Sequence, residues 1–204
     1  MTTHHVDYVN IDDLQETPGN PKEHDIPGIA QSIAALGYAE PILEDGRTGR
    51  IVAGHGRVEA LKHLRDNPGV LADAKAITGD QTPGPPRGVK LGPNGEWMIP
   101  VVRGWESAND DEAMTYLIAS NRWVEMGGWD DTALTEMLST LTSHGGNLME
   151  VTGYTGEDLD RLVSRMALPD LDDFKTPDEG EDDSPQSGIG RQVECPACGH
   201  TFTP

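Results

Sequence analysis

The stretch that decides the fold is R-I-V-A-G-H-G-R-V-E-A-L-K-H-L, residues 50–64. It opens on a short apolar run, Ile51-Val52-Ala53, of the kind that forms a buried strand. Two glycines follow, and beyond them apolar residues recur at helical spacing, at Val58, Leu61 and Leu64. The sequence therefore predicts a strand, a tight glycine turn and a helix in direct succession.

The glycine turn has the properties of an anion site. The start of a helix leaves its first backbone N–H groups unpaired, with the positive end of the peptide dipoles behind them. Gly54 and Gly56 let a ligand approach the backbone closely, and a phosphate suits such a turn. Arg57 adds a planar fork of donors, and His55 adds a group that titrates near neutral pH. The alternative is an ordinary strand-to-helix turn with an exposed arginine.

Four groups of motifs, in a fixed order, resemble the ParB/sulfiredoxin-like superfamily. The resemblance is greatest to phage-type proteins with a ParB N-terminal (ParB-like nuclease) domain. The motifs are V-N-I-D-D-L and P-G-N-P within residues 9–21, I-A-Q-S-I-A-A-L-G-Y-A-E-P-I at 29–42, G-H-G-R-V-E-A at 54–60 and A-S-N-R at 119–122. The resemblance covers residues 6–125 and implies an α+β fold, with a small mixed sheet and packed helices.

The resemblance also implies a function in phage or mobile-element DNA metabolism, based on nucleotide or DNA-phosphate binding. Its motifs assign the phosphate to Gly54, His55, Gly56 and Arg57, with Asn121 and Arg122 completing the pocket. The implied ligands are CTP or ATP/ADP, with Mg²⁺ as a companion ion, and DNA is a further candidate partner. A homodimer is compatible with this resemblance.

The sequence departs from these relatives at three points. Partition proteins carry Glu-Arg-Arg after the glycine where this chain has His55-Gly56-Arg57, which weakens the expectation of CTP selectivity. His55 also stands where sulfiredoxins need a cysteine, which excludes their chemistry. No helix-turn-helix pattern follows the resembling region, so binding to a specific partition site is not expected.

Two other functions fit the same residues. The first is a ParB-like nuclease, nucleotide hydrolase or phosphotransferase, because members of the resembling family are often labelled nucleases. His55 would be its general acid or base, and metal-assisted chemistry would need nearby carboxylates, Glu59 or Glu40, Glu44 and Asp45. The second is an acidic adaptor protein that recruits a partner.

Charge is distributed unevenly along the chain. The formal net charge of −20 argues against general adhesion to nucleic acid, which requires cations that displace counterions. Residues 47–65 nevertheless hold a basic cluster in which Glu59 is the one acid before Asp66. Lys62 and Arg65 fit a solvated helix face equally well. The cluster consists of Arg47, Arg50, Arg57, Lys62 and Arg65.

The chain divides into four predicted regions. Within the first of them, Asp25 predicts a helix N-cap, Pro100 an edge position or a bulge in a strand, and Ser107 a second N-cap. The regions are a ParB/sulfiredoxin-like domain at 1–126 with a Gly- and Pro-rich loop insertion at 66–96, a helical extension at 127–167, an acidic disordered linker at 168–193 and a CxxC knuckle at 194–204.

The two cysteines form one C-x-x-C pair, Cys195 and Cys198, and His200 follows. These three residues resemble a zinc knuckle, and because structural zinc takes four ligands, another histidine or a second chain would supply the last. The alternative is two reduced thiols without a metal. The sparse cysteines, the lack of a secretion signal and the short apolar runs predict a protein of the cytoplasm, in the host cell if phage-encoded, with no membrane partner.

Overall fold

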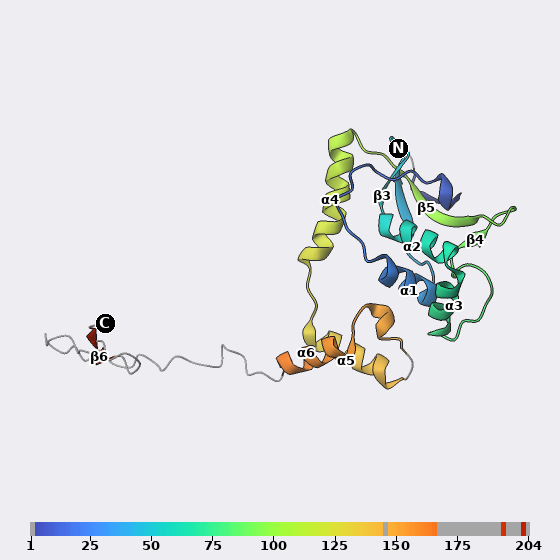
Figure 1. Ribbon diagram of the computed structural model, residues 1–204. Coiled ribbons are helices and arrows are strands. Elements are labelled where there is room, and N and C mark those ends of the chain that lie inside the picture. Colours follow the sequence, from blue (N-terminus) through green and yellow to red (C-terminus); the bar gives the residue numbers. More distant parts are fainter. Residues whose placement is uncertain (1–2, 145–146, 167–192, 195–200, 203–204) are drawn as a thin grey trace. The chain divides into compact units, whose positions relative to one another are not determined.

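The computed structural model describes residues 3–144, 147–166, 193–194 and 201–202. The chain forms two units, residues 1–167 and 168–204. The predicted α+β class, with a small mixed sheet and packed helices, is confirmed in the first unit (Figure 1).

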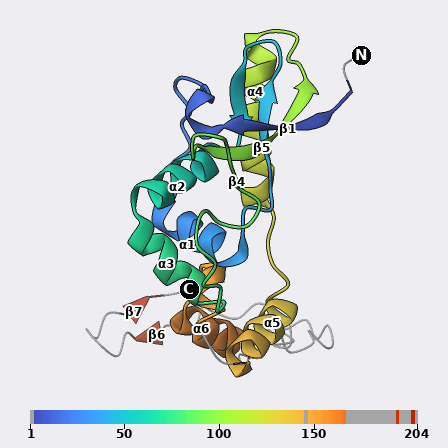
Figure 2. The same cartoon turned by 90° about the vertical axis from the view of Figure 1, so that its right-hand side faces the viewer.

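A mixed sheet forms the centre of the first unit. Its strands are β1 (His5–Asn10), β2 (Ile42–Asp45), β3 (Arg50–Ala53), β4 (Lys90–Leu91) and β5 (Trp97–Trp105). They follow the order β1-β5-β2-β3, and β4 pairs with β5 beside this path. The β2–β5 pair is parallel, whereas the other pairs are antiparallel, and Figure 2 shows β1 lying along β5. The antiparallel strands β2 and β3 form a hairpin, because the turn between them spans only residues 46–49.

Three helices, namely α1 (Ile26–Leu36), α2 (His55–Asp66) and α3 (Pro68–Ala76), pack against one another beside the sheet. Asp25 caps α1 as predicted, because its carboxylate accepts the Gly28 amide at 3.1 Å. The helices and the sheet share one apolar core. Its fully buried members include Ile42, Ile51, Ile99 and Val101 from the strands and Val58, Leu61 and Leu64 from α2.

The helix α4 (Asp110–Met126) lies beside β3, and Leu117 is its one buried residue. Beyond it, α5 (Asp131–Ser143) and α6 (Gly156–Met166) pair around Leu134, Leu138 and Leu162. Thr155 and Asp158 form a capping box before α6, since the side chain of each accepts the backbone amide of the other. The described residues also contain two 3-10 turns, η1 (Ile11–Asp13) and η2 (Glu150–Thr152).

The prediction of an edge position or a bulge at Pro100 is wrong, because β5 is paired on both of its sides and its register with β1 runs through Pro100 without a shift. On one side β1 pairs with residues 98–103. On the other side β4 ends opposite Met98, and β2 begins opposite Val101. On that side Pro100 therefore falls in the gap between two short partners, whereas on the other side it lies opposite Tyr8 of β1.

Two further local expectations differ from the structure. The N-cap of α4 is Asn109, whose side chain accepts the Glu112 amide at 2.9 Å, so the prediction of Ser107 as the cap is wrong. Ser107 is buried and bonds Asp45 instead. The segment 66–96, expected as a loop insertion, includes α3 and β4, and Leu71 and Ala74 of α3 enter the core.

The described part of the second unit consists of two short antiparallel strands, β6 (Val193–Glu194) and β7 (Thr201–Phe202). The predicted metal ligands Cys195, Cys198 and His200 lie outside the described residues, as does the predicted acidic linker up to residue 192. Among the described residues, none of the helices combines the length and the apolar character needed to cross a membrane.

Candidate functional site

The strand–turn–helix unit predicted from residues 50–64 is present, and its backbone leaves two amides free. Gly54, between β3 and α2, has a φ of 99° in the left-handed region. Its carbonyl accepts the amides of Arg57 at 3.0 Å and Val58 at 3.1 Å. The amides of His55 and Gly56 have no acceptor within residues 3–144. The start of α2 thus retains two unpaired donors with the helix dipole behind them.

Gly54 is also required for steric reasons. A Cβ there would lie 2.2 Å from Cγ2 of Ile42 and 2.9 Å from Nη2 of Arg57. The guanidinium of Arg57 therefore lies over the turn, in space that any side chain at position 54 would occupy.

A cleft of about 670 Å³ opens beside this turn. Its walls come from α1, the segment 37–40, the β3–α2 turn and α4. The apolar part of the wall includes Ile29, Ile33 and Leu36 of α1 and Val124 of α4. The polar part includes Gly54, Gly56, Arg57, Ser32, Ser120 and Asn121. Two motifs that are about 65 residues apart in the sequence thus share one cavity.

Arg57 is held in the wall of the cleft. Its side chain is 20% exposed and forms an ion pair with Glu40, whose side chain is 79% exposed. Nη2 lies 3.4 Å from the carbonyl oxygen of Pro41. Nε is buried and lacks an acceptor within the described residues. The guanidinium is positioned at the cleft, and its exposed partner is a carboxylate.

The second predicted motif contributes one residue to the cleft and not the other. Asn121 lines the cleft, and its amide nitrogen donates to the Leu117 carbonyl at 2.9 Å, one turn earlier in α4. Arg122 is 61% exposed, lies 3.7 Å from Glu125 and is not part of the lining. Arg122 thus lies on the outer face of α4 in this structure.

His55 and Glu59, the two predicted catalytic residues, do not line the cleft. His55 is buried, and its Nε2 accepts the Thr17 amide at 3.4 Å. Burial lowers the pKa of His55, with Glu16 opposing and His24 adding to the shift, so the ring is neutral at pH 7. Glu59 lies 3.9 Å from Nδ1 of His24.

His24 is a cleft residue that the sequence did not reveal. Its ring lies against Gly56, where a Cβ would be 2.5 Å from the ring carbon Cδ2. It precedes the N-cap of α1 and belongs to no recognisable motif, so only the packing of α1 on α2 places it in the site.

Tyr38 lines the same end of the cleft and is almost fully buried. Its hydroxyl approaches the Ile42 backbone without satisfying the geometry of a hydrogen bond. Burial raises the pKa of Tyr38 to about 12, although the Arg57 charge opposes this shift. The phenol is therefore a neutral donor at any physiological pH.

Four of the five cations in the predicted basic cluster are paired with carboxylates, and Arg50 is bound to a backbone carbonyl. Arg47 pairs with Asp110 at 2.6 Å, and Arg65 pairs with Asp12 at 2.8 Å. Lys62 lies 3.7 Å from the Glu16 carboxylate, and Arg50 donates to the Glu16 carbonyl at 2.8 Å. With Arg57 paired to Glu40, each of the five cations already has an oxygen partner. The cluster therefore presents little net positive field to a large polyanion.

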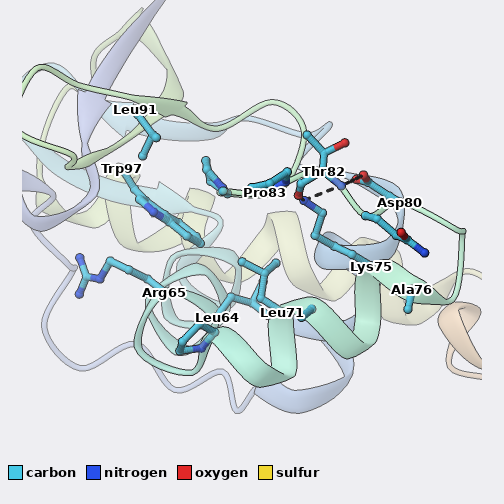
Figure 3. A pocket seen from close by; sticks show the side chains of 15 residues that line it. Leu64, Arg65, Leu71, Lys75, Ala76, Asp80, Thr82, Pro83, Leu91 and Trp97 are labelled. Carbon is cyan, nitrogen blue, oxygen red and sulfur yellow. Dashed lines mark hydrogen bonds and ion pairs between the residues drawn. The ribbon is translucent and has the colours of Figure 1, made fainter.

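A second cavity of about 470 Å³ lies between α2, α3 and the segment 80–85. Figure 3 shows the side chains that line it. Its wall is mainly apolar and includes Leu64, Leu71 and Trp97. The buried Lys75 ammonium donates to the Thr82 carbonyl and lies 3.6 Å from Asp80. Asp80 is only 19% exposed, so its pair with Lys75 opens to an anion less readily than the pair of Arg57 with Glu40, whose side chain is 79% exposed.

The described residues contain no group of three or more His, Cys, Asp or Glu side chains arranged to hold a metal ion. The acidic residues near the turn have other partners: Glu44 binds Arg103 at 3.0 Å, and Asp45 accepts four hydrogen bonds.

Comparison with family models and with curated proteins finds no match for this chain. Among solved structures, the chain is similar to a C-terminally truncated chromosome-partitioning protein ParB from Caulobacter crescentus, complexed with CTP-gamma-S. The two chains are 18% identical, the TM-score is 0.48, and the match covers 81% of each chain.

Proposed function

We propose that the cleft beside the β3–α2 turn binds a nucleotide, with its phosphate held by the turn amides and by Arg57. The supporting observation is that Arg57 is fixed in the cleft wall at 20% exposure, above a glycine turn whose first two helical amides are unpaired. Backbone N–H groups and a guanidinium are donors that phosphate oxygens accept in proteins.

The size and the walls of the cleft favour a nucleotide over a free phosphate ion. A volume of about 670 Å³ lies within the range of roughly 300–1,000 Å³ that small-molecule sites occupy. The apolar stripe of Ile29, Ile33 and Leu36 offers a surface for a base, while Ser32 and Asn121 offer polar contacts for a sugar or base edge. Mg²⁺ would enter as the counterion of the phosphates.

The other proposals receive less support from the described residues. A DNA phosphate would have to approach a chain of net charge −20 whose basic cluster is internally paired. A nuclease or phosphotransferase would need His55 at the phosphate, but the ring is buried against Thr17. No contact of the described residues specifically favours an adaptor.

Calorimetric titration of CTP, ATP, ADP and GTP, each with and without Mg²⁺, tests the proposed function. We expect at least one nucleotide to bind the wild type. Arg57→Ala should then weaken binding about 10- to 100-fold, since charge-assisted bonds contribute roughly 1.5–3 kcal/mol.

The matched control for Arg57→Ala is Arg65→Ala, which removes an arginine of the same helix that pairs with Asp12 and does not line the cleft. Its affinity should equal that of the wild type. Equal affinities for the wild type and Arg57→Ala, or no binding of any nucleotide to the wild type, would reject the proposal.

A further inference from the structure

Glu40 is the one acidic side chain among the residues that line the cleft in the described structure. It lies just before β2, and its carboxylate pairs with Nη1 of Arg57. An acidic group is unexpected in the wall of an anion site, because it repels the ligand that the site is built to hold. The ion pair of Glu40 with Arg57 is therefore not explained by anion binding alone.

The remaining positions on the guanidinium are fixed or closed. Nη2 faces the Pro41 carbonyl at 3.4 Å and lies over Gly54. Nε is buried and cannot be reached from solvent without a rearrangement. Nη1 is thus the position where an incoming oxygen can replace an existing partner, and that partner is Glu40.

Glu40 is free to leave this position. Its side chain is 79% exposed, and Arg57 is its one hydrogen-bond partner in the described residues. An ion pair with so exposed a partner contributes little stability, because water and salt screen it. Rotation of Glu40 into solvent therefore opens the guanidinium without disturbing the core.

We infer that the Glu40 carboxylate occupies the position of the ligand's phosphate on Arg57, and that binding exchanges one anion for the other. This inference rests on the proposed function and adds a determinant of specificity to it. A tethered carboxylate competes at an effective concentration in the millimolar range. A single weak anion is therefore excluded, whereas a di- or triphosphate that also reaches the turn amides displaces Glu40.

The test compares the wild type, Glu40→Gln and Glu23→Gln by calorimetric titration with CTP and with inorganic tripolyphosphate. Glu23→Gln is the matched control, because it removes one negative charge at an exposed residue outside the cleft lining. We expect Glu40→Gln to bind both probes about three- to tenfold more tightly. The substitution removes the exposed carboxylate that competes for Arg57, and it removes one negative charge that repels the ligand. Glu23→Gln should bind as the wild type does.

A second measurement reports on the exchange directly. The Nε–Hε signal of Arg57, assigned by its loss in Arg57→Lys, should shift in ligand-free Glu40→Gln relative to the wild type. Saturation with tripolyphosphate should bring the two proteins to similar positions.

Each outcome of these titrations decides a separate point. Binding by the wild type with unchanged or weaker binding by Glu40→Gln would overturn the exchange, because Glu40 would then be a neutral neighbour or a ligand contact. Absence of binding in all three proteins would reject the proposed function and the exchange together. Glu40→Ala repeats the charge removal with a different side chain and must agree with Glu40→Gln.

Discussion

At the scale of single residues, Gly54 carries two separate constraints that can be measured independently. Its φ of 99° disfavours any L side chain, and a Cβ would overlap Ile42 at 2.2 Å. Gly49, in the β2–β3 turn, also has a positive φ of 66°, but a Cβ there has nothing within 4 Å. Gly49→Ala thus isolates the conformational cost from the steric cost.

We expect Gly49→Ala to lower the free energy of unfolding by about 1–2 kcal/mol, the cost of a left-handed backbone. Gly54→Ala should add about 1–3 kcal/mol for overpacking against Ile42. Urea denaturation of both variants and the wild type provides the comparison. Equal losses would mean that Ile42 moves aside freely, and that the turn is not the tightly packed unit described here.

His55 matches a ligand-binding motif, but its side chain makes a structural contact instead of lining the cleft. Its position directly after Gly54 suggested a ligand contact, but the side chain leaves the cleft and accepts the Thr17 amide. His24, which does line the cleft, comes from the segment before α1. The direction of a side chain at a helix start depends on tertiary packing, and no local pattern specifies it.

At the scale of elements, Asp45 joins the β2–β3 turn to the segment that leads into α4. Its buried carboxylate accepts the amides of Arg47 at 3.1 Å and Ser107 at 2.9 Å, and the hydroxyls of Thr48 and Ser107. Burial disfavours the charged form, but the hydrogen bonds from Ser107, Arg47 and Thr48 outweigh it and lower the pKa of Asp45. The carboxylate therefore stays ionised as a fixed acceptor.

We expect Asp45→Ala to lower the free energy of unfolding by at least about 3 kcal/mol, because it leaves several buried donors without an acceptor. Asp110→Ala is the control, since Asp110 is 88% exposed and pairs with Arg47 in the same region. Its loss should stay below about 1 kcal/mol. Urea denaturation of both variants measures the difference, and similar losses would contradict a structural role for the buried carboxylate.

The sequence predicted the elements whose signals are local. The β3–turn–α2 unit and the Asp25 cap both follow from short-range patterns, and both are present. The helix α3 was missed because Pro68-Gly69 and the Gly- and Pro-rich residues after it suggest a loop. Its stability comes from Leu71 and Ala74 in the core, a tertiary effect that overrides weak local propensity.

Ser107 and Pro100 were misjudged for the same physical reason. Serine is favoured at helix N-caps and proline at strand edges. In this fold, contacts with residues distant in the sequence decide the position of both. Asp45 takes the Ser107 hydroxyl, and the gap between β4 and β2 accommodates Pro100. Pairing partners that are remote in sequence, such as β1 and β5, are not visible in any local window.

At the scale of the whole molecule, the negative net charge and the internal ion pairs of the basic cluster both disfavour DNA binding. The chain carries 35 acidic against 15 basic residues, which is a formal charge of −20. Lys62, Arg65 and Arg57, which the sequence placed around an anion site, are each paired with a carboxylate. A small ligand in the cleft needs only Arg57 and the turn amides, whereas DNA needs several free cations along its backbone.

We therefore expect no binding of a fluorescent 20-base-pair duplex by the wild type at roughly 150 mM salt, measured by anisotropy, under conditions where a nucleotide still binds. The quadruple variant Asp12→Asn, Asp66→Asn, Glu16→Gln, Glu40→Gln removes the carboxylate partners of Arg65, Lys62 and Arg57. It should bind weakly at about 50 mM salt, with a log–log salt slope no steeper than about −3, since each phosphate contact contributes about −0.9. Wild-type binding at the higher salt, with a slope of several units, would show that other cations contact DNA. The DNA-phosphate alternative would then replace the small-ligand site proposed for the cleft.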